Sequence, residues 1–220
     1  MSRRSLAILS AISGIAGPIL LGLSFVINYQ PPPNDATAAQ LSAFGREHLT
    51  SILWGAWLQA VSPVLIVLFA LAIVHLAGAT TRLAGWMTLF GAGVLMTVSL
   101  LEVTFYIGAL EPPSQLGPDS LGLIQAVQHL YFIVASPALF LPLGVVILGS
   151  TVLPRVFGYL ALVLGVGFAA LGAGFLQFLA LPALVTDAAF VSAFWWWAAA
   201  VALIVRTLTG RQQEFVAGPA

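Results

Sequence analysis

The chain of 220 residues is 60% hydrophobic and only 6% charged, with zero net charge and a mean hydropathy of +1.07. Soluble domains carry about 25% charged residues, so this composition excludes a water-soluble fold, and the neutral charge balance gives no indication of nucleic-acid binding. The chain has no cysteine, which excludes disulfides, thiolate metal ligands and cysteine nucleophiles.

Six apolar stretches are each long enough to cross a bilayer, which takes about 20 helical residues. In chain order they cover residues 6–28, 49–76, 83–110, 121–149, 156–181 and 188–208. We therefore predict an all-α fold, a polytopic membrane helix bundle of six transmembrane helices that forms one domain over residues 1–220. The first stretch is too long for a signal-peptide core, so Arg3 and Arg4 are interpreted as a topological anchor.

The longest connection, residues 29–48, contains the triple proline Pro31–Pro33, which favours a stiff extended segment. After it, residues 36–45 are predicted to form a short helix at the membrane interface. Prolines also occur inside the predicted spans, and each is expected to kink its helix because it removes a backbone donor. They are Pro18, Pro63, Pro137 and Pro142.

Arginine placement predicts the orientation of the bundle, since basic residues concentrate on the cytoplasmic side of membrane proteins. In a six-span arrangement, Arg46 alone falls on one side, and all other arginines fall on the opposite side. Five of the seven acidic residues share the side of Arg46: Asp35, Glu47, Glu111, Asp119 and Asp187. We therefore expect a multi-pass protein of the plasma (inner) membrane with both termini in the cytoplasm.

The general layout resembles the small six-span membrane proteins of high-GC bacteria. Three features carry the resemblance: the arginine-led first span, the proline-bearing outer loop at residues 30–34, and a basic set made of arginine with no lysine. The resemblance covers the whole chain through layout and composition. It implies a six-span fold and carries over no functional residues.

Glu102 is the most informative residue, because it is the only acidic residue deep inside an apolar span. A charge at the bilayer centre costs roughly 3 kcal/mol, so such residues are rare and usually functional. Counting 1.5 Å per residue places Glu102 about 12 Å below the outer boundary and His129, on the next span, at the same depth. A short loop joins these spans, so we expect antiparallel neighbours with Glu102 facing His129, and Tyr106 facing Gln125 one turn further out.

Further polar side chains gather in the predicted outer half of the bundle. Gln59, His48 and Gln177 are candidate substrate-binding residues together with Gln125. Trp196 joins them as a candidate cavity wall, although large hydrophobic packing is the alternative for Trp195–Trp197. Three consecutive helical positions cover about 200°, so we expect one of these rings to face protein and another to face lipid.

The leading functional hypothesis is a membrane-embedded acid–base enzyme of isomerase, cyclase or hydrolase type, acting on a hydrophobic lipid or prenyl-type substrate. Glu102, His129 and Tyr106 are its candidate catalytic residues. No aspartate-rich diphosphate motif, zinc motif or nucleophile elbow is present. The alternatives are a proton-coupled small-molecule transporter, which at this size would act as a homodimer, a non-catalytic membrane subunit, and a purely structural pairing of Glu102 with His129.

We expect no cofactor and no resident metal. His48, Glu102 and His129 match the residue types of a two-histidine, one-carboxylate metal site, but they come from separate helices and have no diagnostic spacing. The expected partners are the lipid bilayer and a small hydrophobic molecule.

Overall fold

The computed structural model describes residues 2–28, 36–110, 119–175 and 182–216. This part of the chain is helical and contains no strand. The helices are α1 (Arg3–Ile27), α2 (Ala38–Leu76), α3 (Leu83–Leu110), α4 (Asp119–Leu130), the π-helix η1 (Tyr131–Ala135), α5 (Ser136–Leu148), α6 (Arg155–Phe175) and α7 (Pro182–Val216). Because α4, η1 and α5 follow one another without a break, they form a single membrane span.

Six helical stretches of the described chain are long and apolar enough to cross a membrane, which confirms the predicted six-span bundle. The predicted boundaries are right to within a few residues for α1, α3 and the α4–η1–α5 span. The fifth predicted span agrees with α6 as far as Phe175, and the sixth lies within α7, whose membrane-crossing stretch is Phe190–Thr209. Residues 176–181, at the end of the predicted fifth span, lie outside the described residues.

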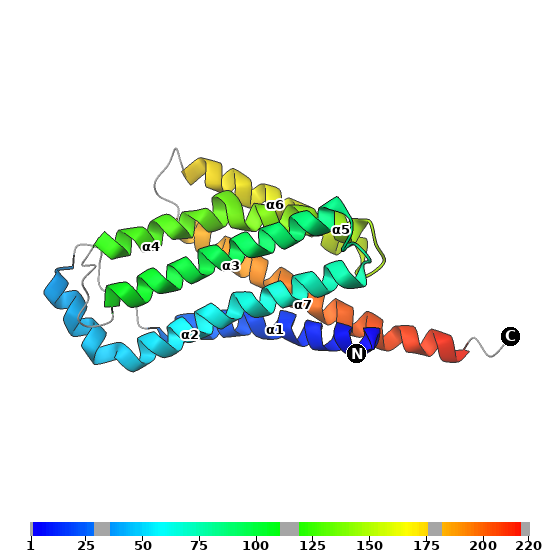
Figure 1. Cartoon of the computed structure of the whole chain (residues 1–220), viewed down its shortest axis with the longest axis horizontal. Coiled ribbons are helices and arrows are strands. Elements are labelled where there is room, and N and C mark those ends of the chain that lie inside the picture. The colour runs from blue at the N-terminus through cyan, green and yellow to red at the C-terminus, as the bar shows by residue number, and fades with distance from the viewer. Residues whose placement is uncertain (1, 29–35, 111–118, 176–181, 217–220) are drawn as a thin grey trace.

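The short helix predicted over residues 36–45 is the first part of α2, which begins at Ala38. Thr37 caps α2: its hydroxyl accepts from the Gln40 backbone N–H at 3.3 Å, and the Gln40 side chain accepts from the Thr37 N–H at 2.8 Å. No proline separates this start from the apolar run, so the helix continues to Leu76. Its first turns lie oblique to the remainder (Figure 1).

The helices run side by side along the long axis of the molecule (Figure 1). Helix α1 packs against α2 and α7, and α3 packs against α2, α4 and α5, while α5 also packs against α6. Both chain termini lie at the same end of the bundle (Figure 1). We call this the arginine end, and the opposite end, where α3 finishes and α4 begins, the acidic end.

The π-helix has a local cause in the sequence. In a regular α-helix the ring of Pro137 would clash with the carbonyl of Ile133, and Pro137 has no N–H to donate. The chain instead widens just before the proline, where the N–H of Ser136 bonds to the carbonyl of Tyr131, five residues back. A π segment holds one extra residue in its turn and is often found at functional sites. Pro137 thus produces a wide turn where a simple kink was predicted.

Aromatic packing fills the middle of the bundle. Trp195 and Trp196 are 3% and 4% exposed, whereas Trp197 is 45% exposed, so two of the three residues pack inside the protein and one faces outward. The ring of Trp196 lies 5.2 Å from that of Phe140 and 6.2 Å from that of Phe69. The Trp195 indole N–H donates to the carbonyl of Phe157 at 3.2 Å, which satisfies its only buried polar atom.

Candidate functional site

Glu102 lies on α3, about 12 Å from the end of the helix at 1.5 Å per residue, and its side chain is 7% exposed. Both carboxyl oxygens accept hydrogen bonds. Gln128 Nε2 donates to Oε1 at 2.8 Å, and the Tyr131 hydroxyl donates to Oε2 at 3.0 Å. The side chain of Gln59 lies beside the carboxyl. A carboxylate offers about four acceptor sites, so about two are left over.

Ser99 extends this network. It lies one turn before Glu102 on α3, and the Tyr131 oxygen is 2.9 Å from its hydroxyl oxygen. Tyr131 has a single hydroxyl proton, whereas the serine hydroxyl can rotate to donate or accept. When Glu102 is ionised, Ser99 donates to Tyr131 and Tyr131 donates to Glu102. When Glu102 is protonated, the same three oxygens support the reverse order, in which Glu102 donates to Tyr131 and Tyr131 donates to Ser99.

Three spans supply the network. Gln59 comes from α2, Ser99 and Glu102 from α3, and Gln128 and Tyr131 from the end of α4 and the start of η1. The spacing of three residues within each pair places its members on one helix face. The expectation that the third and fourth spans meet side by side at this depth is therefore met, since these hydrogen bonds join them.

The predicted partner of Glu102 requires correction. Among the described residues, the hydrogen bonds of its carboxyl go to Gln128 and Tyr131, and His129 is not one of its partners. His129 is half-buried and makes an interaction of its own. The neighbouring residue on the helix, Gln128, has taken the predicted position.

The π-helix explains this exchange of neighbours. The most deeply buried positions of α5 define one helix face, made of Leu139, Leu143 and Ile147. Four turns of 3.6 residues back from Leu143, the middle of that face, lead to a position between Gln128 and His129 that is closer to His129. Because η1 inserts one extra residue, every earlier position takes the place expected for the residue after it, and Gln128 arrives where a regular helix would present His129.

Tyr106 lies one turn beyond Glu102 on α3 and packs against a small hydrophobic cluster that includes Leu41 and Ile52. Its hydroxyl is buried and has no hydrogen-bond partner among the residues that the structure describes. A buried polar atom of this kind calls for an explanation, such as a ligand that completes it. The side chain of Gln125, its predicted partner, lies outside the described side chains, so that pairing stays a prediction.

The remaining predicted residues do not join the network. The ring of His48 contacts its own helix, 4.7 Å from the Phe44 ring and with Nε2 3.9 Å from the Glu47 carboxylate. Trp196 belongs to the aromatic core, which corresponds to the packing alternative. Gln177 lies outside the described residues. Among the described side chains, no three histidine, aspartate or glutamate residues come together as a metal site would require.

Sequence reasoning missed Ser99, Tyr131 and Gln128. A usable signal existed for Ser99, which precedes Glu102 by three residues and therefore shares its face. The signal for Tyr131 and Gln128 was Pro137, because a proline inside a membrane span can be accommodated by a π turn that rotates the preceding residues.

The arrangement is a buried carboxyl with fixed donors and a hydroxyl chain that accommodates either protonation state. Such a group can give and take a proton without moving its neighbours, which is a requirement of general acid–base chemistry. Comparison of the chain with protein-family models, with curated proteins and with solved structures found no match, so the functional argument rests on this geometry.

Proposed function

We propose that this chain is a membrane-embedded acid–base enzyme in which Glu102 exchanges a proton with a hydrophobic substrate. The Ser99–Tyr131–Glu102 chain carries the proposal. Its oxygen separations of 2.9 Å and 3.0 Å suit hydrogen bonding in either direction, so the carboxyl is held in one place whether protonated or ionised. A catalyst that is positioned in both states loses nothing to reorganisation during the reaction.

The reaction class that fits is isomerisation or cyclisation of an unsaturated lipid or prenyl-type molecule. The Glu102 carboxyl transfers its proton to an alkene carbon, and removal of a proton from a neighbouring carbon of the resulting cation returns the carboxyl to its starting state. Atoms and charge balance without a further reactant. The buried Tyr106 hydroxyl, one turn away, is available to a polar group of the substrate. We place the enzyme in the plasma (inner) membrane with both termini in the cytoplasm.

Solvent deuterium provides a test that does not require knowledge of the substrate. The purified protein is reconstituted with a total lipid extract of the producing cells in D₂O, and the lipids are then analysed by mass spectrometry. The proton on Glu102 comes from solvent, so we expect one lipid class to gain carbon-bound deuterium with the wild type and not with Glu102→Gln. Identical deuterium patterns for the two proteins would contradict the enzyme.

Glu47→Gln is the matched control, because it removes the same charge from a side chain that is 75% exposed. This variant is expected to give the wild-type deuterium pattern. Loss of the signal in Glu47→Gln as well would show that charge alone, rather than the buried network, is responsible.

A proton-coupled transporter is the second candidate, and the meeting of three spans at one carboxyl favours it. A change at Glu102 acts directly on η1 through the Tyr131 hydrogen bond and on α2 through the adjacent side chain of Gln59. Such a transporter would act on small molecules and, at this size, as a homodimer. Its test is uptake of a panel of small solutes into proteoliposomes under a pH gradient: a transporter shows pH-driven uptake of one solute that Glu102→Gln abolishes, while the lipids gain no deuterium.

A further inference from the structure

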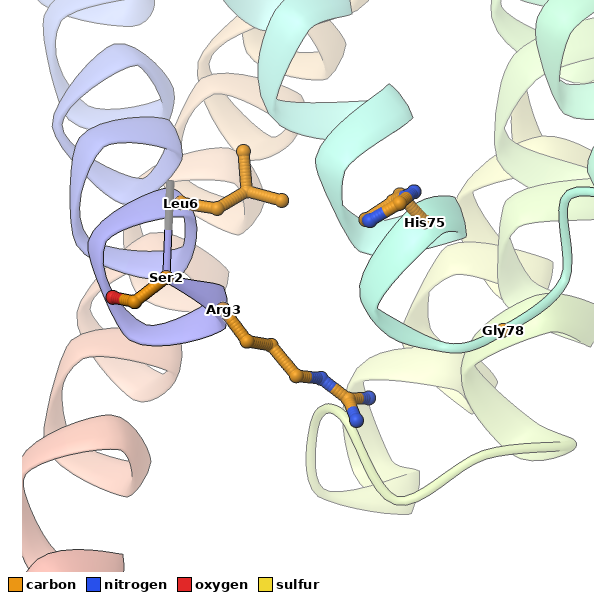
Figure 2. A pocket seen from close by; sticks show the side chains of 5 residues that line it. All are labelled: Ser2, Arg3, Leu6, His75 and Gly78. Atoms are coloured by element: carbon orange, nitrogen blue, oxygen red, sulfur yellow. The ribbon is translucent and has the colours of Figure 1, made fainter.

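The arginine end contains two cavities that share Arg3. The first, of about 520 Å³, lies between the start of α1 and the end of α2, and Figure 2 shows Arg3 reaching across this space below His75. The second, of about 570 Å³, is lined by residues from α1, α2, the α5–α6 connection and α7. Its polar lining consists of Arg3, Arg4, Arg206, Ser150, Thr151 and Thr207.

Three arginines therefore line one cavity, and no acidic residue is among the described residues of its lining. The only ion pair among the described side chains is Glu47 with His48, which belongs to the N-terminal part of α2 at the other end of the bundle. Glu214, two turns beyond Arg206 on α7, is among the residues whose side chains are not described. Like charges that line one cavity repel one another, so an anion bound among these three arginines would be stabilised.

The hydrogen bonding of the arginines also favours a bound anion. Arg3 donates one N–H to the carbonyl of Leu76, the last residue of α2, and an arginine has five donors. The Nε atom of Arg4 is buried and has no partner among the residues that the structure describes. An orphaned, charged donor inside a cavity is costly unless something supplies an acceptor.

The hydrogen bonds of the neighbouring hydroxyl groups restrict which kind of ligand the cavity can bind. Ser150 donates its proton to the carbonyl of Ile147 at 3.2 Å, and Thr207 donates to the carbonyl of Leu203 at 2.7 Å. The donors left for a ligand are mainly the guanidinium groups, whose planar fork matches the oxygens of phosphate. A suitable ligand thus offers several acceptor oxygens and negative charge.

We propose that this cavity binds a phosphate group, either the headgroup phosphate of an anionic phospholipid or free inorganic phosphate. Both sources offer the same oxygens to Arg3, Arg4 and Arg206. Basic pockets between membrane helices commonly hold anionic headgroups at the cytoplasmic surface. The apolar part of the lining, which includes Ala7 and Leu203, suits the glycerol and upper acyl region of a phospholipid.

The test measures binding to the full-length, detergent-purified protein by native mass spectrometry, with phosphatidylglycerol, phosphatidylcholine or inorganic phosphate as the probe. We expect phosphatidylglycerol to bind, and Arg4→Gln and Arg206→Gln each to weaken it about tenfold, the effect of losing one charged hydrogen bond. Phosphatidylcholine should bind more weakly, because its choline cation meets the arginines. Binding of inorganic phosphate with the same arginine dependence supports the proposal with free phosphate as the source.

Arg155→Gln is the matched control. It removes the same charge at the same end of the bundle, but Arg155 does not line either cavity and is exposed. Equal weakening by Arg155→Gln would show only general surface charge and would overturn the proposal, as would binding of none of the three probes. If a glutamine variant fails to fold, Arg4→Lys and Arg206→Lys keep the charge and remove the planar fork, and they are expected to weaken binding as well.

Discussion

The two ends of this bundle differ in how their polar side chains are paired. At the acidic end, Glu102 receives hydrogen bonds from Gln128 and Tyr131, so the charge-bearing group is matched by donors from the protein itself. At the arginine end, three arginines line one cavity, and the described part of its lining contains no carboxylate. The first arrangement is complete within the chain, while the second is completed by an anion from outside.

This contrast explains why we assign chemistry to one end and binding to the other. A buried group with fixed partners is preorganised, which suits a proton-transfer site. A cluster of unmatched like charges gains stability whenever a ligand of opposite charge is present. Stability measurements on single variants test this contrast. Removing a side chain from the Glu102 network should lower the free energy of unfolding much more than removing one of the arginines that line the cavity.

Glu102→Ala is expected to have the largest effect. It leaves the half-buried Gln128 amide without its acceptor and limits the Tyr131 hydroxyl to Ser99, and the unsatisfied donor together with the cavity left by the side chain costs about 3 kcal/mol. The free energy of unfolding is measured in mixed micelles by titration with a denaturing detergent. Glu47→Ala, which removes an exposed carboxylate, is the control and should change stability little. If Glu102→Ala is as stable as Glu47→Ala, the acidic end is not a matched network.

Gly172→Ala is expected to have the second largest effect on stability, because the added methyl group would overlap with η1, which positions Tyr131. A Cβ at Gly172 would lie 2.8 Å from Ile133 Cα and 2.9 Å from Ile133 N. Overpacking of this kind costs typically 1–3 kcal/mol. Gly167→Ala on the same helix is the control, since its Cβ would meet nothing within 4 Å. Equal stability of the two variants, measured by the same titration, would show that η1 can move away from α6 without cost.

The sequence predicts the properties that follow from the apolar length of a segment or from the position of a residue along it. It does not predict which way a helix face is rotated about its axis. Six spans follow from apolar length, and the depth of Glu102 follows from counting 1.5 Å per residue. The partner of Glu102 does not follow in this way, because a single extra residue in η1 turns the α4 face by about 100°. A helix accommodates a proline by a kink or by a π turn, and packing decides which of them forms. Here the backbone of Ile133 in η1 closely approaches Gly172 of α6.

The arginine end shows the same limit. The positive-inside pattern predicts that Arg3, Arg4 and Arg206 share one end of the bundle, which they do. It does not predict that their side chains line one cavity, because α1 and α7 meet only through tertiary packing between the two ends of the sequence. Contacts that depend on which distant helices become neighbours lie beyond local pattern.

Tyr131→Phe should have a smaller effect on stability and a clear effect on proton exchange. It removes the hydroxyl that joins Ser99 to Glu102, at a cost of about 1 kcal/mol, typical of a hydrogen bond between membrane helices. We expect deuterium transfer to lipid to fall strongly. His129→Ala is the informative comparison, because the Glu102 carboxyl does not depend on it for a hydrogen bond, and its deuterium transfer should stay near wild type. The reverse result would restore His129 as the proton partner of Glu102.

Arg206→Gln should have the smallest effect on stability, and the sign of that effect tests the contrast most directly. In detergent without phospholipid or phosphate, removal of one of three unmatched charges relieves repulsion, so the variant should be as stable as the wild type or slightly more stable. With phosphatidylglycerol present, the wild type gains the free energy of binding and becomes the more stable of the two. No such crossing is expected for Glu102→Ala, whose lost partners lie within the chain. If Arg206→Gln is destabilised equally with and without the lipid, the arginine end is held together by contacts of its own and needs no anion.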